Sequence, residues 1–255
     1  MTTSHQSHVE QQFGARAAAY VASPVHAQGM GLDELEALVR AEPRGRILDL
    51  GCGGGHASFR LAPHAEEVVA LDLSPRMLSA VREEAARRGL SNIRTECGSV
   101  EALAFADASF DIVVSRLSAH HWTGWDLGLK EAARVAKPGG LAVFIDSVAP
   151  ENALLDTWLQ TLELLRDSSH VRSYSRSEWQ RGLGRAGLLP LSIQSSRVHL
   201  EFASWIERIG TPRTQADAIR ALQGQMPAGV ADFFALEPDG SFSIEIALFE
   251  ARKPG

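Results

Sequence analysis

Short apolar runs alternate with longer amphipathic stretches over the first 150 residues of the chain. The runs have the length of buried strands, which we predict at residues 46–50, 67–73, 92–97, 110–115 and 140–146. Between them, residues 77–89 and 125–140 carry apolar side chains three and four positions apart and end in glycine, which indicates helices. This alternation predicts a mostly parallel sheet with helices on both faces.

The pattern becomes more helical after residue 150. Helical periodicity covers residues 153–167, 175–187 and much of 203–235, and strands are predicted at 189–202 and 241–252. Ser175 is followed three positions later by Glu178, which is the signature of a helix capping box. We expect one integrated domain in three parts, with an N-terminal helical lid at 1–40, a ligand-binding core at 41–150, and lid helices plus the last two strands at 151–255.

Composition argues against several classes of protein, namely nucleic-acid-binding, membrane, secreted, disulfide-rich and metal-binding proteins. Hydrophobic residues make up 45% of the chain, the net charge is -6, and no Lys- or Arg-rich run indicates a nucleic-acid partner. The apolar runs are far shorter than the ~20 residues of a membrane span, and the N-terminus lacks a secretion-signal pattern. Two cysteines, Cys52 and Cys97, form no disulfide framework, and no Cys/His cluster has metal-ligand spacing. We therefore expect a cytoplasmic protein without a metal, membrane or nucleic-acid partner.

The stretch ILDLGCGGGHAS, residues 47–58, joins the first strand to a helix. The dinucleotide fingerprint G-x-G-x-x-G, counted from Gly51, needs a glycine at the position of His56. This departure favours a nucleoside ligand without a pyrophosphate. Asp72 stands about 20 residues after Gly51, where an acid accepts hydrogen bonds from ribose hydroxyls. Asp72 fits the adenosine of S-adenosylmethionine as well as NAD, and it argues against NADP.

Four segments together resemble class I S-adenosylmethionine-dependent methyltransferases, in the small-molecule branch with ubiquinone/menaquinone-biosynthesis and biotin-pathway-type enzymes. They are ILDLGCGGGHAS, VVALDLSPRML, ALAFADASFDIVVS and EAARVAKPGGLAVF, in this order. The resemblance covers residues 8–150 strongly and the rest weakly. It implies a Rossmann-like seven-stranded α/β sheet with helices on both faces, an antiparallel last strand, a helical lid, and S-adenosylmethionine as cofactor.

The resemblance also implies the roles of several loop residues. Asp49 would orient the glycine loop or reach the amino group of the cofactor, and Asp72 would bind the ribose. Met77 would pack on the adenine, or serve only as core. Three glycines would wrap the methionine portion of the cofactor: Gly51, Gly53 and Gly55.

A second group of cofactor residues follows the later strands. The family often has Gly-Asp-Ala where this chain has Gly-Ser-Val at 98–100, so Ser99 would be a weaker acceptor for the adenine amino group. Arg116 is either a clamp for the cofactor carboxylate or a surface charge. Three further residues are expected at this site: Leu73, Val100 and Ser115.

His120 and His121 stand in the loop after the fourth predicted strand, where ligands bind in open α/β sheets. A histidine can take a proton near neutral pH. Asp146 ends the next strand and can hold a histidine in one tautomer, an arrangement similar to natural-product sugar O-methyltransferases. We predict His121 as general base with Asp146 as its partner. His120 as the base, or a purely structural pair, are the alternatives.

The lid supplies the candidate substrate contacts. Phe13 and Tyr20 lie seven positions apart on one helical face and either line the pocket or pack the helix on the core. His170, Arg172 and Tyr174 lie in a predicted loop and either contact the substrate or are solvated. The predicted function is methyl transfer to the oxygen or nitrogen of a small organic acceptor, of natural-product or quinone-like type, by a monomer or homodimer. A non-catalytic S-adenosylmethionine-binding protein and an NAD-dependent oxidoreductase are the alternatives.

Overall fold

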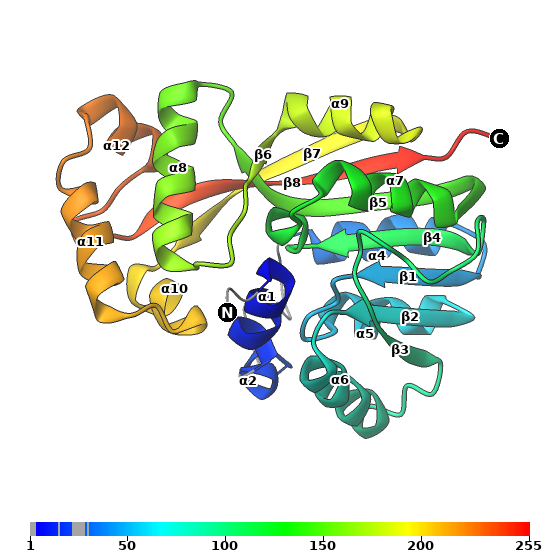
Figure 1. The fold of residues 1–255 in the computed structure, drawn as a ribbon. Helices are drawn as coiled ribbons and strands as arrows, with labels where there is room; N and C mark the ends of the chain where they lie inside the picture. The colour runs from blue at the N-terminus through cyan, green and yellow to red at the C-terminus, as the bar shows by residue number, and fades with distance from the viewer. Residues whose placement is uncertain (1–3, 15, 22–28, 30) are drawn as a thin grey trace.

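The computed structural model describes residues 4–14, 16–21, 29 and 31–255. These residues form one eight-stranded sheet in the order β3-β2-β1-β4-β5-β8-β7, with β6 paired to β5 (Figure 1). The strands are β1 (Arg46–Leu50), β2 (Glu67–Asp72), β3 (Ile93–Cys97), β4 (Phe110–Arg116), β5 (Ala136–Ala149), β6 (Tyr174–Ser175), β7 (Leu189–Leu200) and β8 (Phe242–Arg252). Strand β8 runs antiparallel to both β5 and β7, whereas the pairs among β1 to β5 are parallel. The predicted methyltransferase sheet with an antiparallel last strand is confirmed, and the two-residue β6 is the addition to the expected seven strands.

The helices lie on both faces of the sheet (Figure 1). They are α1 (His5–Gly14), α2 (Ala17–Val21), α4 (Leu32–Ala41), α5 (His56–Leu61), α6 (Pro75–Arg87), α7 (Trp125–Val135), α8 (Ala153–Arg166), α9 (Arg176–Ala186), α10 (Phe202–Ile209), α11 (Arg213–Gln223) and α12 (Ala228–Phe234). Ser175 and Glu178 form the predicted capping box of α9. No helix in the described part of the chain is long and apolar enough to cross a membrane.

Successive strand residues face opposite sides of the sheet, and each side has its own core. Ile47 and Ile112 belong to a core with α4 and α5, while Leu48 and Val113 belong to a core with α7 and α9. Strands β1 and β4 are therefore buried on both faces, which explains why their sequences are continuously apolar.

A third core lies beyond the parallel sheet, where β7 and β8 extend toward α8 and α10–α12 (Figure 1). Trp205 is almost fully buried there and lies edge-on to Phe242, with ring centroids 5.0 Å apart. We call α8, α10–α12 and the chain that joins them the lobe. Helix α1 contacts this lobe through two hydrogen bonds. Gln12 Nε2 donates to the carbonyl of Ile209, and His8 Nε2 is hydrogen-bonded to Ser168 Oγ. Helix α1 thus lies between the lobe and the sheet.

Two predicted helices end earlier than the periodicity indicated. The helix predicted at 125–140 ends at Val135, because Ala136 already pairs with β4 and Pro138 has no amide hydrogen to continue a helix. The helix expected to carry both Phe13 and Tyr20 on one face is divided into α1 and α2, and residues 22–28 of the expected lid lie outside the described residues. At the end of α1, a Cβ on Gly14 would lie 2.8 Å from Ser74 Oγ, so this helix packs closely on the start of α6.

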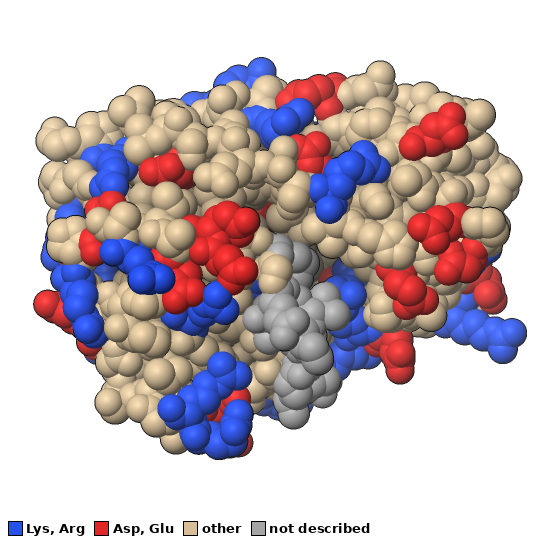
Figure 2. Space-filling view, turned by 180° about the vertical axis from the view of Figure 1, so that it is seen from behind, with Lys and Arg blue, Asp and Glu red and all other residues tan. Residues whose placement is uncertain are grey.

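The surface charges are mixed in sign. On the face seen in Figure 2, acidic and basic side chains are interspersed, in keeping with 31 acidic and 25 basic residues in the chain. This pattern differs from the continuous basic stripe that a nucleic-acid-binding protein presents.

Candidate active site

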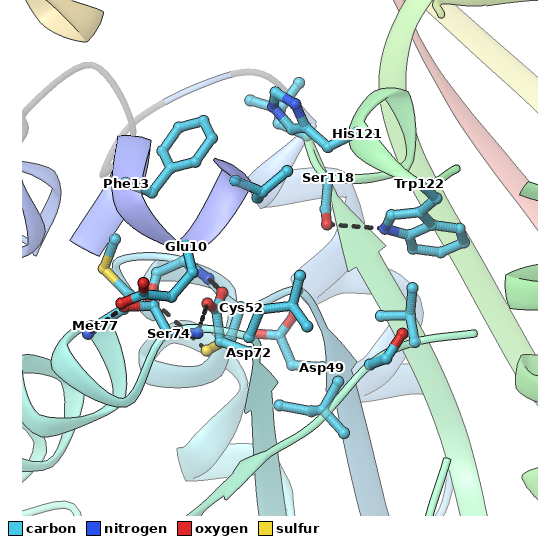
Figure 3. Close-up of a pocket in the computed structure, with 18 of the residues that line it drawn as sticks. Glu10, Phe13, Asp49, Cys52, Asp72, Ser74, Met77, Ser118, His121 and Trp122 are labelled. Carbon is cyan, nitrogen blue, oxygen red and sulfur yellow. Dashed lines mark hydrogen bonds between the residues drawn. The ribbon is translucent and has the colours of Figure 1, made fainter. Parts of the chain in front are cut away.

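A cavity of about 1090 Å³ opens at the carboxyl ends of β1, β2 and β4, beneath α1 and α2 (Figure 3). This is the edge of an open α/β sheet where ligands bind. Every described residue that lines the cavity stands at or before Trp122 in the chain.

The glycine loop after β1 forms the floor of this cavity. Gly51 has a φ of +66°, and a Cβ there would lie 1.9 Å from Ser118 Oγ. A Cβ on Gly54 would lie 2.8 Å from the carbonyl oxygen of Tyr20, so α2 packs directly on the loop. His56, which interrupts the dinucleotide fingerprint, donates from Nε2 to the same carbonyl at 2.8 Å. His56 therefore ties the loop to the lid, a role that the sequence reasoning missed.

Asp72 stands at the end of β2, and each of its two carboxylate oxygens accepts a hydrogen bond from a different main-chain amide. It accepts from the amide of Gly53 at 2.9 Å and from the amide of Ser74 at 2.9 Å, while burial raises its pKa. Each oxygen keeps further acceptor capacity for ribose hydroxyls. Leu73, Met77 and Val100 also line this part of the cavity.

Ser99 lines the cavity on the same side and is contacted by the lid. Its hydroxyl accepts a hydrogen bond from Gln6 Nε2 of α1 at 3.0 Å. The residue expected to meet the adenine amino group is thus bound to α1 in this structure.

Asp49 and Arg116 form the charged end of the cavity. Asp49 Oδ2 accepts from the Ser58 hydroxyl at 2.6 Å, but Oδ1 is buried without a hydrogen-bond partner among the described residues. Burial raises the pKa of Asp49 to about 6, against the opposing effects of Ser58 and Arg116. Burial also lowers the pKa of Arg116 to about 10. An amino acid's ammonium and carboxylate groups would satisfy Asp49 Oδ1 and pair with Arg116, so these residues fit the methionine end of S-adenosylmethionine.

Ser115 does not belong to the cavity wall. Its hydroxyl donates to the carbonyl of Leu50 at 3.0 Å, and its side chain is fully buried between β4 and β1. Successive side chains of β4 point to opposite faces of the sheet, and of these two neighbours only Arg116 lines the cavity.

The structure pairs Asp146 with His120, so the predicted pairing of Asp146 with His121 is wrong. His120 Nδ1 lies 2.5 Å from Asp146 Oδ1, and Asp146 Oδ2 accepts from the amide of Ala119 at 2.8 Å. The Ala119–His121 segment is a short 3₁₀ turn, which directs the two neighbouring side chains differently. Burial alone would lower the pKa of His120, but the charge and hydrogen bond of Asp146 outweigh burial and raise it.

His121, and not His120, lines the cavity (Figure 3). Its Nδ1 lies 3.0 Å from the carbonyl oxygen of Ser169, and its Nε2 has no hydrogen-bond partner in the described part of the chain. Its ring lies against Phe13, with centroids 5.0 Å apart, and against His120 at 4.1 Å. Burial, helped by the nearby charge of His120, lowers the pKa of His121 to about 4. His121 is therefore neutral at pH 7.

The lid aromatics reach the cavity, whereas the other candidate substrate residues do not. Phe13 and Tyr20 both line it, and their rings meet edge to face at 5.4 Å. The other three candidates, expected in one loop, contact residues of the fold instead. His170 lies on Gln160, Arg172 on Asp156 and Glu178, and Tyr174, which belongs to β6, stacks on Trp125.

Two further cavity residues come from the histidine loop itself. Ser118 accepts a hydrogen bond from Trp122 Nε1 at 3.1 Å, and both side chains line the cavity (Figure 3). They flank the His120–His121 pair in the sequence, and their position after β4 was the signal that could have found them.

Comparison with known proteins places this geometry in a family. A family model described as a methyltransferase domain matches residues 48–144. The chain is 42% identical over 203 residues to the uncharacterized protein YafE of Escherichia coli K12, an alignment that covers 80% of this chain and 98% of YafE. It is 35% identical over 203 residues to the uncharacterized methyltransferase YcgJ of Bacillus subtilis, covering 80% of each chain. The crystal structure of YcgJ matches with a TM-score of 0.85 at 32% identity, over 88% of this chain and 98% of that one.

A further relative has a named acceptor. The chain is 30% identical over 232 residues to the 27-O-demethylrifamycin SV methyltransferase of Amycolatopsis mediterranei, covering 87% of this chain and 82% of that enzyme.

Proposed function

Because the chain belongs to the class I S-adenosylmethionine-dependent methyltransferases, small-molecule branch, we propose that it transfers a methyl group to the oxygen or nitrogen of a small organic acceptor. One observation carries this proposal. His121 Nε2, which no described residue hydrogen-bonds, lies on the same cavity as Asp49 and Asp72, which fit the two ends of the cofactor.

The residues of the chain divide the work of the reaction. Asp72 would hold the ribose, and Asp49 with Arg116 would hold the amino-acid end. The bound cofactor would supply an electrophilic methyl group on a sulfonium. His121 would accept the proton that the acceptor loses as its lone pair forms the new bond to carbon.

The low pKa of His121 suits an acceptor that loses its proton only after its bond to the methyl carbon has begun to form. A neutral hydroxyl is a far weaker acid than a histidine with a pKa of about 4. As the oxygen forms its bond to the methyl carbon, it gains positive charge and its proton becomes strongly acidic. A neutral, correctly oriented imidazole can then take the proton.

The walls of the cavity favour an apolar or aromatic acceptor. Phe13, Tyr20, Leu117 and Trp122 line the cavity near His121. Apolar walls with a few placed polar groups are typical of small-molecule sites. The relative from Amycolatopsis mediterranei is named as a methyltransferase of 27-O-demethylrifamycin SV, and the O-demethyl group in that name supports oxygen as the receiving atom.

Calorimetry and a turnover screen test the proposal. We expect S-adenosylhomocysteine to bind and NAD not to bind. Phenolic, sugar and heteroaromatic acceptors are then screened for formation of S-adenosylhomocysteine, with His121→Ala beside wild type. His199→Gln, which replaces an exposed histidine paired with Glu237, is the matched control. Absence of S-adenosylhomocysteine binding would refute the proposal. Cofactor binding without turnover of any acceptor class would favour the non-catalytic alternative.

A further inference from the structure

The segment between α8 and β6, residues 167–173, is polar, and four of its seven residues are buried, while Ser168 and Val171 are exposed. Asp167, Ser169 and Ser173 are 2%, 0% and 0% exposed. Burying polar groups is unfavourable unless they are hydrogen-bonded. In this loop, the amides of Val171 and Arg172 donate to the carbonyl of His120 at 2.8 and 3.1 Å. The 167–173 loop is therefore fastened to the turn that carries both histidines.

One contact of this loop determines where the proton of His121 sits. A carbonyl oxygen can only accept, so the 3.0 Å contact between His121 Nδ1 and the Ser169 carbonyl places the proton on Nδ1. Neutral imidazole carries one N–H, and Nε2 then has the free lone pair. Because His121 lines the cavity, this tautomer is the one able to receive a proton there.

Asp167 holds the carbonyl-bearing residue in place. Its Oδ1 accepts from the amide of Ser169 at 2.8 Å and from the Ser169 hydroxyl at 2.6 Å. Asp167 does not line the cavity, and its hydrogen bonds reach His121 only by way of Ser169, although its charge also acts on the His121 ring. At the other end of the loop, Gln160 of α8 accepts from the amide of Ser173 at 3.0 Å and lies 2.9 Å from His170 Nε2. These bonds fix the loop at both ends.

We propose that Asp167 is a positioning residue, which fixes the ring orientation and tautomer of His121 through Ser169 so that Nε2 faces the methyl acceptor. The proposal rests on the proposed function, in which His121 receives the acceptor's proton. It extends the site to a carboxylate on α8's C-terminal side, 46 positions along the chain from His121.

The test reads the tautomer directly. Nitrogen-15 NMR of the histidine rings distinguishes a protonated from an unprotonated ring nitrogen, and the His121 signals are assigned by their loss in His121→Asn. In wild type at neutral pH we expect one tautomer, with the proton on Nδ1. Asp167→Ala should give a mixture of tautomers. It should also lower kcat by about 10- to 100-fold, the size of effect found when the partner that orients a metal-ligating histidine is removed. The affinity for S-adenosylhomocysteine should stay within a few-fold.

Two variants grade the effect and a third serves as control. Asp167→Asn keeps an acceptor oxygen for both Ser169 donors, so the single tautomer should be retained. Ser169→Ala keeps the main-chain carbonyl but loses the hydroxyl, which donates to Asp167 and lies 3.3 Å from His121 Nδ1, and it should fall between the others. Asp126→Asn replaces a carboxylate of α7 that binds the exposed Arg185, outside the 167–173 loop and its anchors. It should leave the tautomer unchanged.

The outcomes separate this proposal from the function on which it rests. A folded Asp167→Ala protein that keeps the single Nδ1–H tautomer overturns the positioning role. If Asp167→Ala does not fold, the same result in Ser169→Ala overturns it. Mixed tautomers with undiminished turnover would confirm the positioning of the ring while refuting proton acceptance by His121.

Discussion

Replacing His170 by glutamine should make the protein more resistant to acid. Burial, with the nearby His120 and His121, lowers the pKa of His170 to about 3, whereas an unfolded histidine titrates near 6.5. The charges of Asp167 and Asp146 act in the opposite direction on the pKa of His170, but their effects are smaller than that of burial. As the pH falls below 6.5, the unfolded state binds a proton that the folded state refuses, so the free energy of unfolding decreases.

The size of this effect follows from the shift. One pH unit corresponds to about 1.36 kcal/mol for one proton, and pH 5 lies about 1.5 units below the unfolded pKa. Between pH 7.5 and pH 5, His170 should therefore account for about 2 kcal/mol of lost stability. His170→Gln keeps an amide that can donate to Gln160 Oε1 but has no group that titrates in this range.

Urea unfolding monitored by tryptophan fluorescence measures the effect. The free energy of unfolding is determined for wild type and His170→Gln at several values between pH 5 and pH 7.5. The difference between the two proteins should change by about 2 kcal/mol in favour of the variant toward pH 5. His199→Gln, at an exposed histidine, is the control for removing an imidazole as such. Parallel curves for wild type and His170→Gln would refute the reasoning, because they would show that His170 does not resist protonation in the fold.

Four further outcomes are expected. Asp72→Ala should weaken the binding of S-adenosylhomocysteine by roughly 1.5–3 kcal/mol, measured by calorimetry, because charge-assisted hydrogen bonds to the ribose are lost; unchanged affinity would remove Asp72 from the ribose site. His121→Ala should lower kcat by about 10²–10⁴-fold with cofactor affinity within a few-fold, and normal turnover would exclude its role as proton acceptor. Asp146→Asn should lower the free energy of unfolding, measured in urea, by about 3–5 kcal/mol. The reason is that both carboxylate oxygens accept hydrogen bonds here, whereas the NH₂ group of asparagine cannot accept one. The donors are His120 Nδ1 and the amides of Ala119, His120 and Ser147. Deleting residues 1–28 should leave a folded sheet by circular dichroism with poor turnover, and full activity would contradict a lid role for α1 and α2.

The sheet was predictable because its signals are local. Strands β1, β2 and β4 are largely buried, so an apolar run marks each of them without knowledge of its neighbours, whereas the edge strand β3 is only partly buried. The glycine loop and Asp72 were equally readable, since a turn at the end of a strand and an acid at the end of the next strand meet at the same edge of the sheet.

The end of the cavity that holds the two histidines was not predictable in the same way. The sequence places His120 and His121 side by side, but the turn that holds them decides which ring meets Asp146 and which meets the cavity. The contact between His121 and Ser169 joins residues 48 positions apart, and no local pattern announces it. Tyr174 likewise resembled a lid aromatic, but a core tryptophan, Trp125, stacks on it at 4.0 Å.

The division of the cavity wall has a consequence for how such proteins diversify. Among the residues that the structure describes, the floor comes from the sheet loops between Asp49 and Trp122, while the roof comes from α1 and α2, between His5 and Val21. A recombination event that replaced this stretch would exchange the roof and leave the floor intact. New acceptors can thus be acquired by inheritance of a single contiguous segment, without renewed selection on the strands that hold the cofactor.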